Sequence, residues 1–378
     1  MSTARTEDPH VSMAELGVRN VAARVLIAGG GTGGHVYPGI AIAKEIQRRR
    51  PDTVILFVGT DRGLETRIVP AEGFRLETIT VSGLKGKSGV RQLKSLFEIP
   101  ASLWQCRRIL AAFKPSVVVG VGGYASGPPL LLAALRGIPT LIQEQNALPG
   151  LTNRLLARFV NKVATAFAES ERYFGSKAVL TGNPVRPEFK GLPRREEQES
   201  FTILIFGGSQ GARAINQAMM GALPLLAGQF SELRFVHQTG DKDYDEVSAS
   251  YRASGVSHEV RPFFYDIPAQ YARANLIICR AGATTLAETS VSGRAALLIP
   301  FARASDNHQQ KNAEALVRAG AAEMILEKDL TPQLLANRIL FLKSRPHELR
   351  SMEEKSRGLG RPDSTERIVD LVENLMHV

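Results

Sequence analysis

Three glycine-rich segments give this chain of 378 residues its clearest chemical feature, because each directly follows a short apolar run. They span residues 29–34 (GGGTGG), 120–127 (GVGGYASG) and 207–211 (GGSQG). A glycine-rich turn between a strand and a helix brings backbone N–H groups close to an anion, at the positive end of the helix dipole. Any one of these loops is equally well explained as a tight turn that needs only positive φ. Three of them at equivalent positions favour binding of phosphate groups.

The first loop does not match the common nucleotide-binding fingerprints. GxGxxG fits Gly29, Gly31 and Gly34, but no acidic residue closes the next expected strand, residues 54–58, and Asp61 lies beyond it. An NAD site needs that carboxylate for the ribose. The GxxxxGK[ST] pattern of P-loop enzymes is absent from the sequence. These observations argue against a nicotinamide-dependent oxidoreductase and a P-loop kinase.

Two titratable residues stand beside the glycine loops. His35 ends the first loop, where a neutral imidazole could take a proton from a sugar hydroxyl, a cationic one could bind phosphate, or the ring could simply cap the turn. Glu288 closes the segment RAGATTLAE (280–288), one or two turns into an expected helix. A carboxylate there could accept hydrogen bonds from both hydroxyls of a ribose, although most helix glutamates are simply solvated.

Two further polar segments have both a functional and an ordinary explanation. Amide side chains gather at a helix start in 306–312 (DNHQQKN), where they could bind sugar hydroxyls, but a polar helix cap is the simpler interpretation. Four cations, Lys85, Lys87, Arg91 and Lys94, alternate with apolar residues in 84–99. A basic amphipathic stretch of this kind can lie on an anionic bilayer, and a solvated helix face explains it equally well.

Apolar runs alternate with amphipathic segments along the chain. In the first half we expect strands over 24–28, 54–58, 117–121 and 140–143, with helices over 40–50, 90–113 and 130–136. In the second half we expect strands over 202–206, 233–238, 276–279 and 296–299, with helices over 284–292, 307–319 and 365–376. Continuous apolar strands between helices predict parallel sheets covered on both faces, that is, an α/β fold.

The two halves repeat one pattern, a strand followed by GGxxG and a helix, on either side of a proline-rich and charged segment at 184–200. This predicts two similar domains that face each other across a cleft, with ligands at the carboxyl ends of the strands. We expect a disordered tail at 1–20, a first domain over 21–184 that the last helix (361–378) rejoins, and a second domain over 185–360.

Composition narrows the class of protein. The net charge of +10 favours an anionic partner such as nucleic acid, a phosphorylated substrate or an acidic lipid surface. The two cysteines do not form a disulfide framework, the first 20 residues lack the apolar core of a signal peptide, and no apolar run is long enough to cross a bilayer. We therefore expect a cytoplasmic protein whose membrane contact is peripheral.

Seven segments, taken together, resemble one enzyme family in the family's own order. They are GGGTGGHVYPGIAIA (29–43), GVGGYASGP (120–128), QEQNALPGLTNRLLA (143–157), TGNPVRPEF (181–189), FGGSQGARAIN (206–216), CRAGATTLAE (279–288) and IPFARASDNHQQKNA (299–313). The family is that of the UDP-N-acetylglucosamine:undecaprenyl-pyrophosphoryl-muramyl-pentapeptide N-acetylglucosaminyltransferases of peptidoglycan synthesis, the MurG family. Its members have the GT-B fold of two Rossmann-like domains.

The resemblance also implies functions for matching residues. The donor, UDP-N-acetylglucosamine, would lie in the second domain, with Glu288 on the ribose, and the first domain would face an anionic membrane surface. Positions that match substrate contacts are Thr32, Gly33, Gly34, Asn146, Arg186, Ser209, Phe264, Ala283, Thr284, Thr285, Leu286, Ala287, Glu288 and Gln309 (with Gln310 as the alternative to Gln309).

The implied reaction is a single displacement with inversion at the anomeric carbon, from UDP-N-acetylglucosamine to the 4-hydroxyl of a lipid-linked muramyl-pentapeptide. His35 is the candidate catalytic base, backbone N–H groups of 209–211 and Arg186 would stabilise the leaving UDP, and we expect neither a metal nor a cofactor. The alternatives are a UDP-N-acetylglucosamine 2-epimerase and, more remotely, a nucleic-acid-binding protein. The latter lacks support because only 6% of the residues are aromatic and no recognition motif is present.

Overall fold

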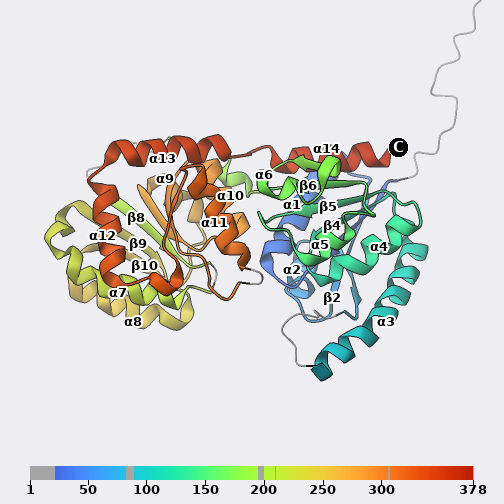
Figure 1. Cartoon of the computed structure of the whole chain (residues 1–378), viewed down its shortest axis with the longest axis horizontal. Helices are drawn as coiled ribbons and strands as arrows, with labels where there is room; N and C mark the ends of the chain where they lie inside the picture. The colour runs from blue at the N-terminus through green and yellow to red at the C-terminus, as the bar shows by residue number, and fades with distance from the viewer. Residues whose placement is uncertain (1–21, 82–88, 195–199, 209, 305–306, 378) are drawn as a thin grey trace, which may run out of the picture.

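The computed structural model describes residues 22–81, 89–194, 200–208, 210–304 and 307–377, without the side chains of 89–99. Two domains lie side by side, each built on one parallel sheet with helices on both faces (Figure 1). This arrangement confirms the α/β architecture of two Rossmann-like domains. The tail at 1–20, for which the sequence predicts disorder, lies outside the described residues.

The first sheet has the strand order β3-β2-β1-β4-β5-β6-β7, and all its described pairs are parallel. Its strands are β1 (Arg24–Gly29), β2 (Val54–Thr60), β3 (Arg75–Ile79), β4 (Val117–Gly122), β5 (Thr140–Glu144), β6 (Lys162–Thr165) and β7 (Ala178–Leu180). Its helices are α1 (Gly33–Arg49), α2 (Glu65–Ala71), α3 (Gly89–Phe113), α4 (Gly127–Leu135), α5 (Leu151–Leu156) and α6 (Ala168–Glu171). Helices α1 and α2 cover one face of the central strands, and α3, α4 and α5 cover the other. Both faces are therefore buried, which accounts for the continuous apolar sequence of these strands.

The second sheet has the order β10-β9-β8-β11-β12-β13 and is also parallel. Its strands are β8 (Phe201–Phe206), β9 (Leu233–Gln238), β10 (Ser257–Arg261), β11 (Leu276–Cys279), β12 (Ala295–Leu298) and β13 (Glu323–Met324). The helices are α7 (Arg213–Leu226), α8 (Tyr244–Ser254), α9 (Ile267–Arg273), α10 (Ala283–Ser292), α11 (His308–Arg318), α12 (Pro332–Lys343) and α13 (Pro346–Leu359). Helices α7, α8, α12 and α13 cover one face, and α9, α10 and α11 cover the other.

The chain crosses between the domains twice. The first crossing follows β7, and Phe189 already packs in the core of the second domain. The second crossing follows α13, after which α14 (Ser364–Met376) returns to the first domain and buries Ile368 and Val372 beside α1. The two crossings touch each other, since the Ser364 hydroxyl donates to the Asn183 carbonyl at 2.8 Å.

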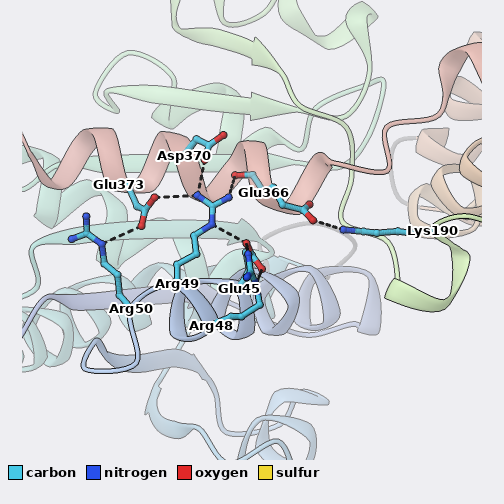
Figure 2. Close-up of polar contacts among 8 residues, drawn as sticks. All are labelled: Glu45, Arg48, Arg49, Arg50, Lys190, Glu366, Asp370 and Glu373. Atoms are coloured by element: carbon cyan, nitrogen blue, oxygen red, sulfur yellow. Dashed lines mark hydrogen bonds and ion pairs between the residues drawn. The ribbon is translucent and has the colours of Figure 1, made fainter.

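Ion pairs connect α14 to α1 (Figure 2). Arg49 donates to Asp370 at 2.6 Å, to Glu373 at 3.0 Å and to Glu45 of its own helix at 2.8 Å. Arg50 also donates to Glu373, at 3.1 Å. The last helix is therefore an integral part of the first domain through both apolar burial and ion pairs.

The start of α1 differs from the sequence-based expectation. The sequence pattern predicts a helix from residue 40, yet α1 begins at Gly33 and contains Pro38. Pro38 is the sixth residue of α1, past the first turn, so it removes one N–H group from the hydrogen bonds of the helix. Burial of Val36, Pro38 and Ile40 then outweighs the weak local helix propensity.

Candidate functional site

The glycine-rich loops at 29–34 and 120–127 interlock at the carboxyl edge of the first sheet. The Gly30 N–H donates to the Gly122 carbonyl at 3.4 Å, and a Cβ on Gly123 would lie 2.5 Å from the Gly30 carbonyl oxygen. Gly122 and Gly123 have φ of +99° and +79°, a conformation that favours glycine. These glycines are therefore required by close backbone contact, so the tight-turn explanation holds for this part of the loops.

Glu65 stabilises the loop at 29–34 through hydrogen bonds, a role that the sequence did not predict. Its buried carboxylate accepts from the Gly31 N–H, the Thr60 N–H and the Thr60 hydroxyl, each at 2.8 Å. The N–H groups of Gly30 and Gly31 are thus used within the protein. Those of Gly33 and Gly34 belong to the first turn of α1, which lacks a side-chain cap at Thr32, so an anion at this loop would meet the helix start.

His35 lies in the first turn of α1, partly buried, with its Nδ1 3.2 Å from Oε1 of Gln145. Burial lowers the pKa of the imidazole below its ordinary value, while hydrogen bonds to Gln145 and to the Val121 carbonyl act in the opposite direction. His308 of the second domain also lowers it. A neutral imidazole at this position can accept a proton, which a cation cannot.

Arg186 and Glu288 form an ion pair where the first crossing reaches the second domain. The Nε and one Nη of Arg186 donate to the two carboxylate oxygens of Glu288 at 2.8 and 3.2 Å. The Glu288 side chain is 7% exposed and that of Arg186 is 49% exposed, so the carboxylate is held inside and the guanidinium reaches solvent. Burial raises the pKa of Glu288, and the bonds from Arg186 oppose that rise.

The start of α10 presents mainly small residues beside this pair. Ala283, Thr284, Thr285 and Ala287 are partly exposed. Leu286 points into the core and is 1% exposed, so only its backbone can contact a ligand. Gly282 is the N-cap and makes no side-chain cap, which leaves the first N–H groups of α10 for an anion.

Gln309 and Gln310 have different surroundings. Oε1 of Gln309 accepts from the N–H groups of Ala281 and Phe301 at 3.2 and 2.9 Å, which fixes the loop before α10. Both bonds use the oxygen, so the Nε2 group remains a donor for a ligand. Gln310 instead donates to Glu314 on its own helix at 2.9 Å. The geometry therefore favours Gln309 over Gln310 as the residue beside the start of α10.

Asn146 and Asn312 join the two domains directly. Asn312, fully buried on α11, donates to Oδ1 of Asn146 at 3.1 Å and accepts from the Ala147 N–H at 2.9 Å. The cluster of polar residues at 306–312, for which a helix cap was the simpler interpretation, thus contributes Asn312 to the domain interface. Asp306 itself lies outside the described residues.

Two expected donor contacts are modified by the structure. Phe264 is buried in the core at 2% exposure, and its N–H donates to Gln238 at 2.8 Å, so its side chain is enclosed by the second domain. In the glycine-rich loop at 207–211, the Gly211 N–H donates to the Gly208 carbonyl at 3.0 Å and is not directed at an anion. Ser209 of the same loop lies outside the described residues.

Comparison with known proteins assigns the family. The glycosyltransferase family 28 N-terminal domain matches residues 25–165, and the glycosyltransferase family 28 C-terminal domain matches residues 202–370. This chain belongs to glycosyltransferase family 28. The matches cover both domains and confirm that it is a glycosyltransferase.

The most similar relatives carry one name. The chain is 51% identical over 356 residues to the UDP-N-acetylglucosamine–N-acetylmuramyl-(pentapeptide) pyrophosphoryl-undecaprenol N-acetylglucosamine transferase of Myxococcus xanthus, covering 93% of each chain. It is 49% identical to the protein of the same name from Syntrophus aciditrophicus, covering 92% of this chain and 97% of that one. These identities confirm the resemblance to the N-acetylglucosaminyltransferases of peptidoglycan synthesis.

Solved structures agree. MurG of Acinetobacter baumannii has a TM-score of 0.80 at 33% identity, covering 93% of this chain and 99% of that one. The UDP-GlcNAc 2-epimerase of Neisseria meningitidis has a TM-score of 0.63 at 14% identity, covering 93% and 100%. The second likeness shows the shared fold alone, so the family 28 relatives carry the assignment.

Proposed function

We propose that this chain transfers N-acetylglucosamine from UDP-N-acetylglucosamine to the 4-hydroxyl of a lipid-linked muramyl-pentapeptide, undecaprenyl-pyrophosphoryl-muramyl-pentapeptide. The names of relatives about 50% identical over nearly the whole chain supply the two substrates. The observation that supports a transfer between them is that the two domains meet beside His35 and Asn146 of the first: His308 of α11 lowers the pKa of His35, and Asn312 of α11 donates to Asn146. An acceptor on the first domain and a donor on the second would then face each other.

The donor would bind at the start of α10. Glu288 is the proposed ligand of the ribose hydroxyls, and Gln309 with the small residues of 283–287 would contact the diphosphate and sugar. Arg186 donates to the Glu288 carboxylate in this structure. The ribose hydroxyls therefore have to bind Glu288 beside Arg186 or displace Arg186 from it. If the guanidinium turns to the diphosphate, it neutralises charge that grows on the leaving UDP, together with the positive end of α10.

The acceptor would bind at the first domain. Its diphosphate matches the anion site formed by Gly33 and Gly34 at the start of α1. His35 is the proposed base: it takes the proton of the 4-hydroxyl as that oxygen bonds to the anomeric carbon and the bond to UDP breaks. One displacement of this kind inverts the anomeric configuration. Charge stabilisation by Arg186 and helix ends requires no metal in this scheme.

A membrane-bound acceptor implies contact with a lipid surface, at the cytoplasmic face of the bacterial plasma (inner) membrane. In the described parts of the chain, no helix is long and apolar enough to span a bilayer. The basic stretch at 84–99 is the proposed contact, but its side chains lie outside the described residues. Further along α3, Trp104 is 59% exposed and stacks with Arg108 at 4.8 Å, an aromatic and cationic pair of the type found at membrane interfaces.

The test is transfer of radiolabelled sugar from UDP-N-acetylglucosamine to a lipid-linked muramyl-pentapeptide. We expect label in the lipid product only when both substrates are present. The same donor incubated without acceptor separates the rival function, because an epimerase would form the manno isomer from the donor alone. Isomer formation without transfer would overturn the proposal.

A further inference from the structure

Three buried amide side chains connect the candidate base to the donor helix. They are Gln145, Gln143 and Asn183, which are 2%, 0% and 3% exposed. Gln143 lies in β5, Gln145 directly follows that strand, and Asn183 lies at the first crossing between the domains. Buried amides need hydrogen-bond partners for both the oxygen and the nitrogen, so their orientations are determined by what surrounds them.

The bonds form one continuous series. Gln145 lies beside His35, and its Nε2 donates to the Val121 carbonyl at 2.7 Å and to Oε1 of Gln143. Nε2 of Gln143 donates to Oδ1 of Asn183 at 3.0 Å, and Nδ2 of Asn183 donates to the Thr284 hydroxyl at 3.3 Å. The series begins in the first domain and ends on the first turn of α10 in the second.

The carbonyl of Val121 sets the direction of the series. A carbonyl only accepts, so the Gln145 atom that faces it has to be the NH₂ group, and a flipped amide would oppose two oxygens. The same NH₂ group donates its second hydrogen to Gln143. Oε1 of Gln145 is therefore the atom that faces His35, and Nδ1 of His35 has to carry a hydrogen to bond with it.

We infer that Gln145 is a positioning residue, which holds His35 in the tautomer with hydrogen on Nδ1 and the lone pair on Nε2. This inference rests on the proposed function of His35 as the base. Gly122 restricts the ring from another side, since a Cβ there would lie 2.6 Å from Nδ1. The basic Nε2 then has one orientation. In other catalytic sites, an acceptor hydrogen-bonded to one ring nitrogen fixes the tautomer and orientation of a histidine in the same way.

Two substitutions of Gln145 separate tautomer control from simple packing. Methionine keeps the length of the side chain but offers His35 no acceptor, so the Nε2–H tautomer, favoured by free histidine in water, should become populated. Glutamate loses the NH₂ donor as methionine does, but it still offers Nδ1–H an acceptor and adds a negative charge. It should keep the tautomer and raise the pKa of His35, whose other nearby titratable groups are His308 and Glu65.

The direct measurement is the ¹⁵N spectrum of histidine-labelled protein, in which the two tautomers have different ring-nitrogen shifts. A His35→Gln protein identifies the His35 signals among those of the 7 histidines. We expect Nδ1–H in the parent and in Gln145→Glu, and loss of that pattern in Gln145→Met. Gln333→Met is the matched control, because Gln333, like Gln145, donates to the oxygen of a side-chain amide, that of Asn337 at 2.9 Å, but on the exposed face of α12.

Kinetics complete the test. Gln145→Met should lower kcat by about 10-fold to 100-fold, part of what a well-placed general base contributes, with donor KM little changed. Gln145→Glu should move the acidic limb of the kcat profile to higher pH. A parent spectrum with hydrogen on Nε2, or a Gln145→Met protein with unchanged tautomer and kcat, would overturn the inference. An active His35→Gln protein would instead refute His35 as the base and leave the tautomer assignment standing.

Discussion

At the scale of single residues, Glu288 and Arg186 stand out because each was expected to hold a different part of the donor, yet they hold each other. A bidentate guanidinium–carboxylate pair occupies one lone pair on each carboxylate oxygen, and each oxygen has another. The ribose hydroxyls can therefore bind Glu288 while Arg186 stays or leaves. In either case, Glu288 fixes the position of the Arg186 guanidinium before the donor binds.

Replacing Glu288 tests this directly. Glu288→Ala should raise donor KM strongly and leave acceptor KM little changed, because hydrogen bonds to a charged group contribute about 1.5–3 kcal/mol. Steady-state kinetics with each substrate varied gives the answer, with circular dichroism to verify folding. Arg186→Ala is the companion variant and should lower kcat more than Glu288→Ala does. A folded Glu288→Ala protein with an unchanged donor KM would remove the ribose assignment.

The same carboxylate predicts a pH dependence. Burial raises the pKa of Glu288, so it takes up a proton at a higher pH than an exposed glutamate. Donor binding needs the carboxylate form and should weaken as the pH falls through that raised pKa. Donor KM measured across the acidic range should rise earlier than an ordinary glutamate would allow. Glu288→Gln, which cannot titrate, should show a flat profile over the same range.

The reaction is expected to proceed without a divalent metal. In the parts of the chain that the structure describes, no three His, Cys, Asp or Glu side chains gather where they could hold a metal ion. Arg186 and the start of α10 are placed to neutralise the leaving group instead. Activity should survive extensive treatment with a chelator. Reversible loss of activity in a protein that remains folded would contradict this prediction.

The sequence predicted some of these residues and not others, for a physical reason. His35 and Glu288 adjoin glycine-rich segments, and such segments have a recognisable local pattern. Gln145 has no pattern of its own, and its contact with His35 joins residues 110 positions apart. Glu65 is similar, since it supports a loop 34 residues away. Supporting residues of this kind become visible only when the sheet brings distant strand ends together.

At the scale of elements, the buried strands were the most predictable parts. Strands β1, β4 and β8 are continuous apolar runs buried on both faces, and the sequence predicted all three. β10 was missed because SHEVR is polar and lies at the edge of its sheet, where little apolar area is buried. Helix α14 was expected as a final helix, but its ion pairs with α1 could be known only from the fold.

Those ion pairs should contribute measurably to stability. Arg49→Met removes bonds to Asp370, Glu373 and Glu45 and should lower the free energy of unfolding by about 2 kcal/mol, because several charge-assisted bonds act together. The neighbouring Arg48→Met is the matched control. Among the described residues Arg48 bonds only to Glu45, and it is 68% exposed, so its replacement should lower the free energy of unfolding far less than Arg49→Met does.

Urea unfolding followed by circular dichroism measures the difference. Trp104, the single tryptophan, lies on α3 and provides a fluorescence signal from the first domain. The Arg49→Met protein should show its loss in the transition reported by Trp104. Equal effects of the two substitutions would mean that the contacts with α14 add nothing to the stability of the first domain.

At the scale of the whole molecule, the two domains are joined by more than the two crossings of the chain. Asn312 contacts Asn146 and Ala147, and Arg318 of α11 pairs with Glu169 of α6 at 2.9 Å. The repeated strand and GGxxG pattern was enough to predict two similar domains. It could not predict which polar residues would meet between them, because that depends on the angle at which the domains pack.

The whole molecule also has to reach a lipid-linked acceptor, and the basic stretch at 84–99 is the proposed contact. Each cation near an anionic surface contributes about 1 kcal/mol, screened by salt. Replacing Lys85, Lys87, Arg91 and Lys94 by Gln should therefore weaken binding to anionic vesicles at low salt. It should reduce activity on a long-chain lipid acceptor more than on a short soluble analogue. Donor KM should hardly change, since the donor is proposed to bind the other domain.

A second variant with the same loss of charge distinguishes a local docking surface from a general effect of net charge. It replaces four exposed cations of the second domain by Gln: Lys242, Arg273, Lys328 and Lys355. If the stretch at 84–99 is the docking surface, this protein should bind vesicles like the parent. If both variants lose binding equally, the net charge of +10 provides a diffuse attraction, and the stretch has no special part in it. If neither variant loses binding, exposed apolar residues such as Trp104 carry the contact instead.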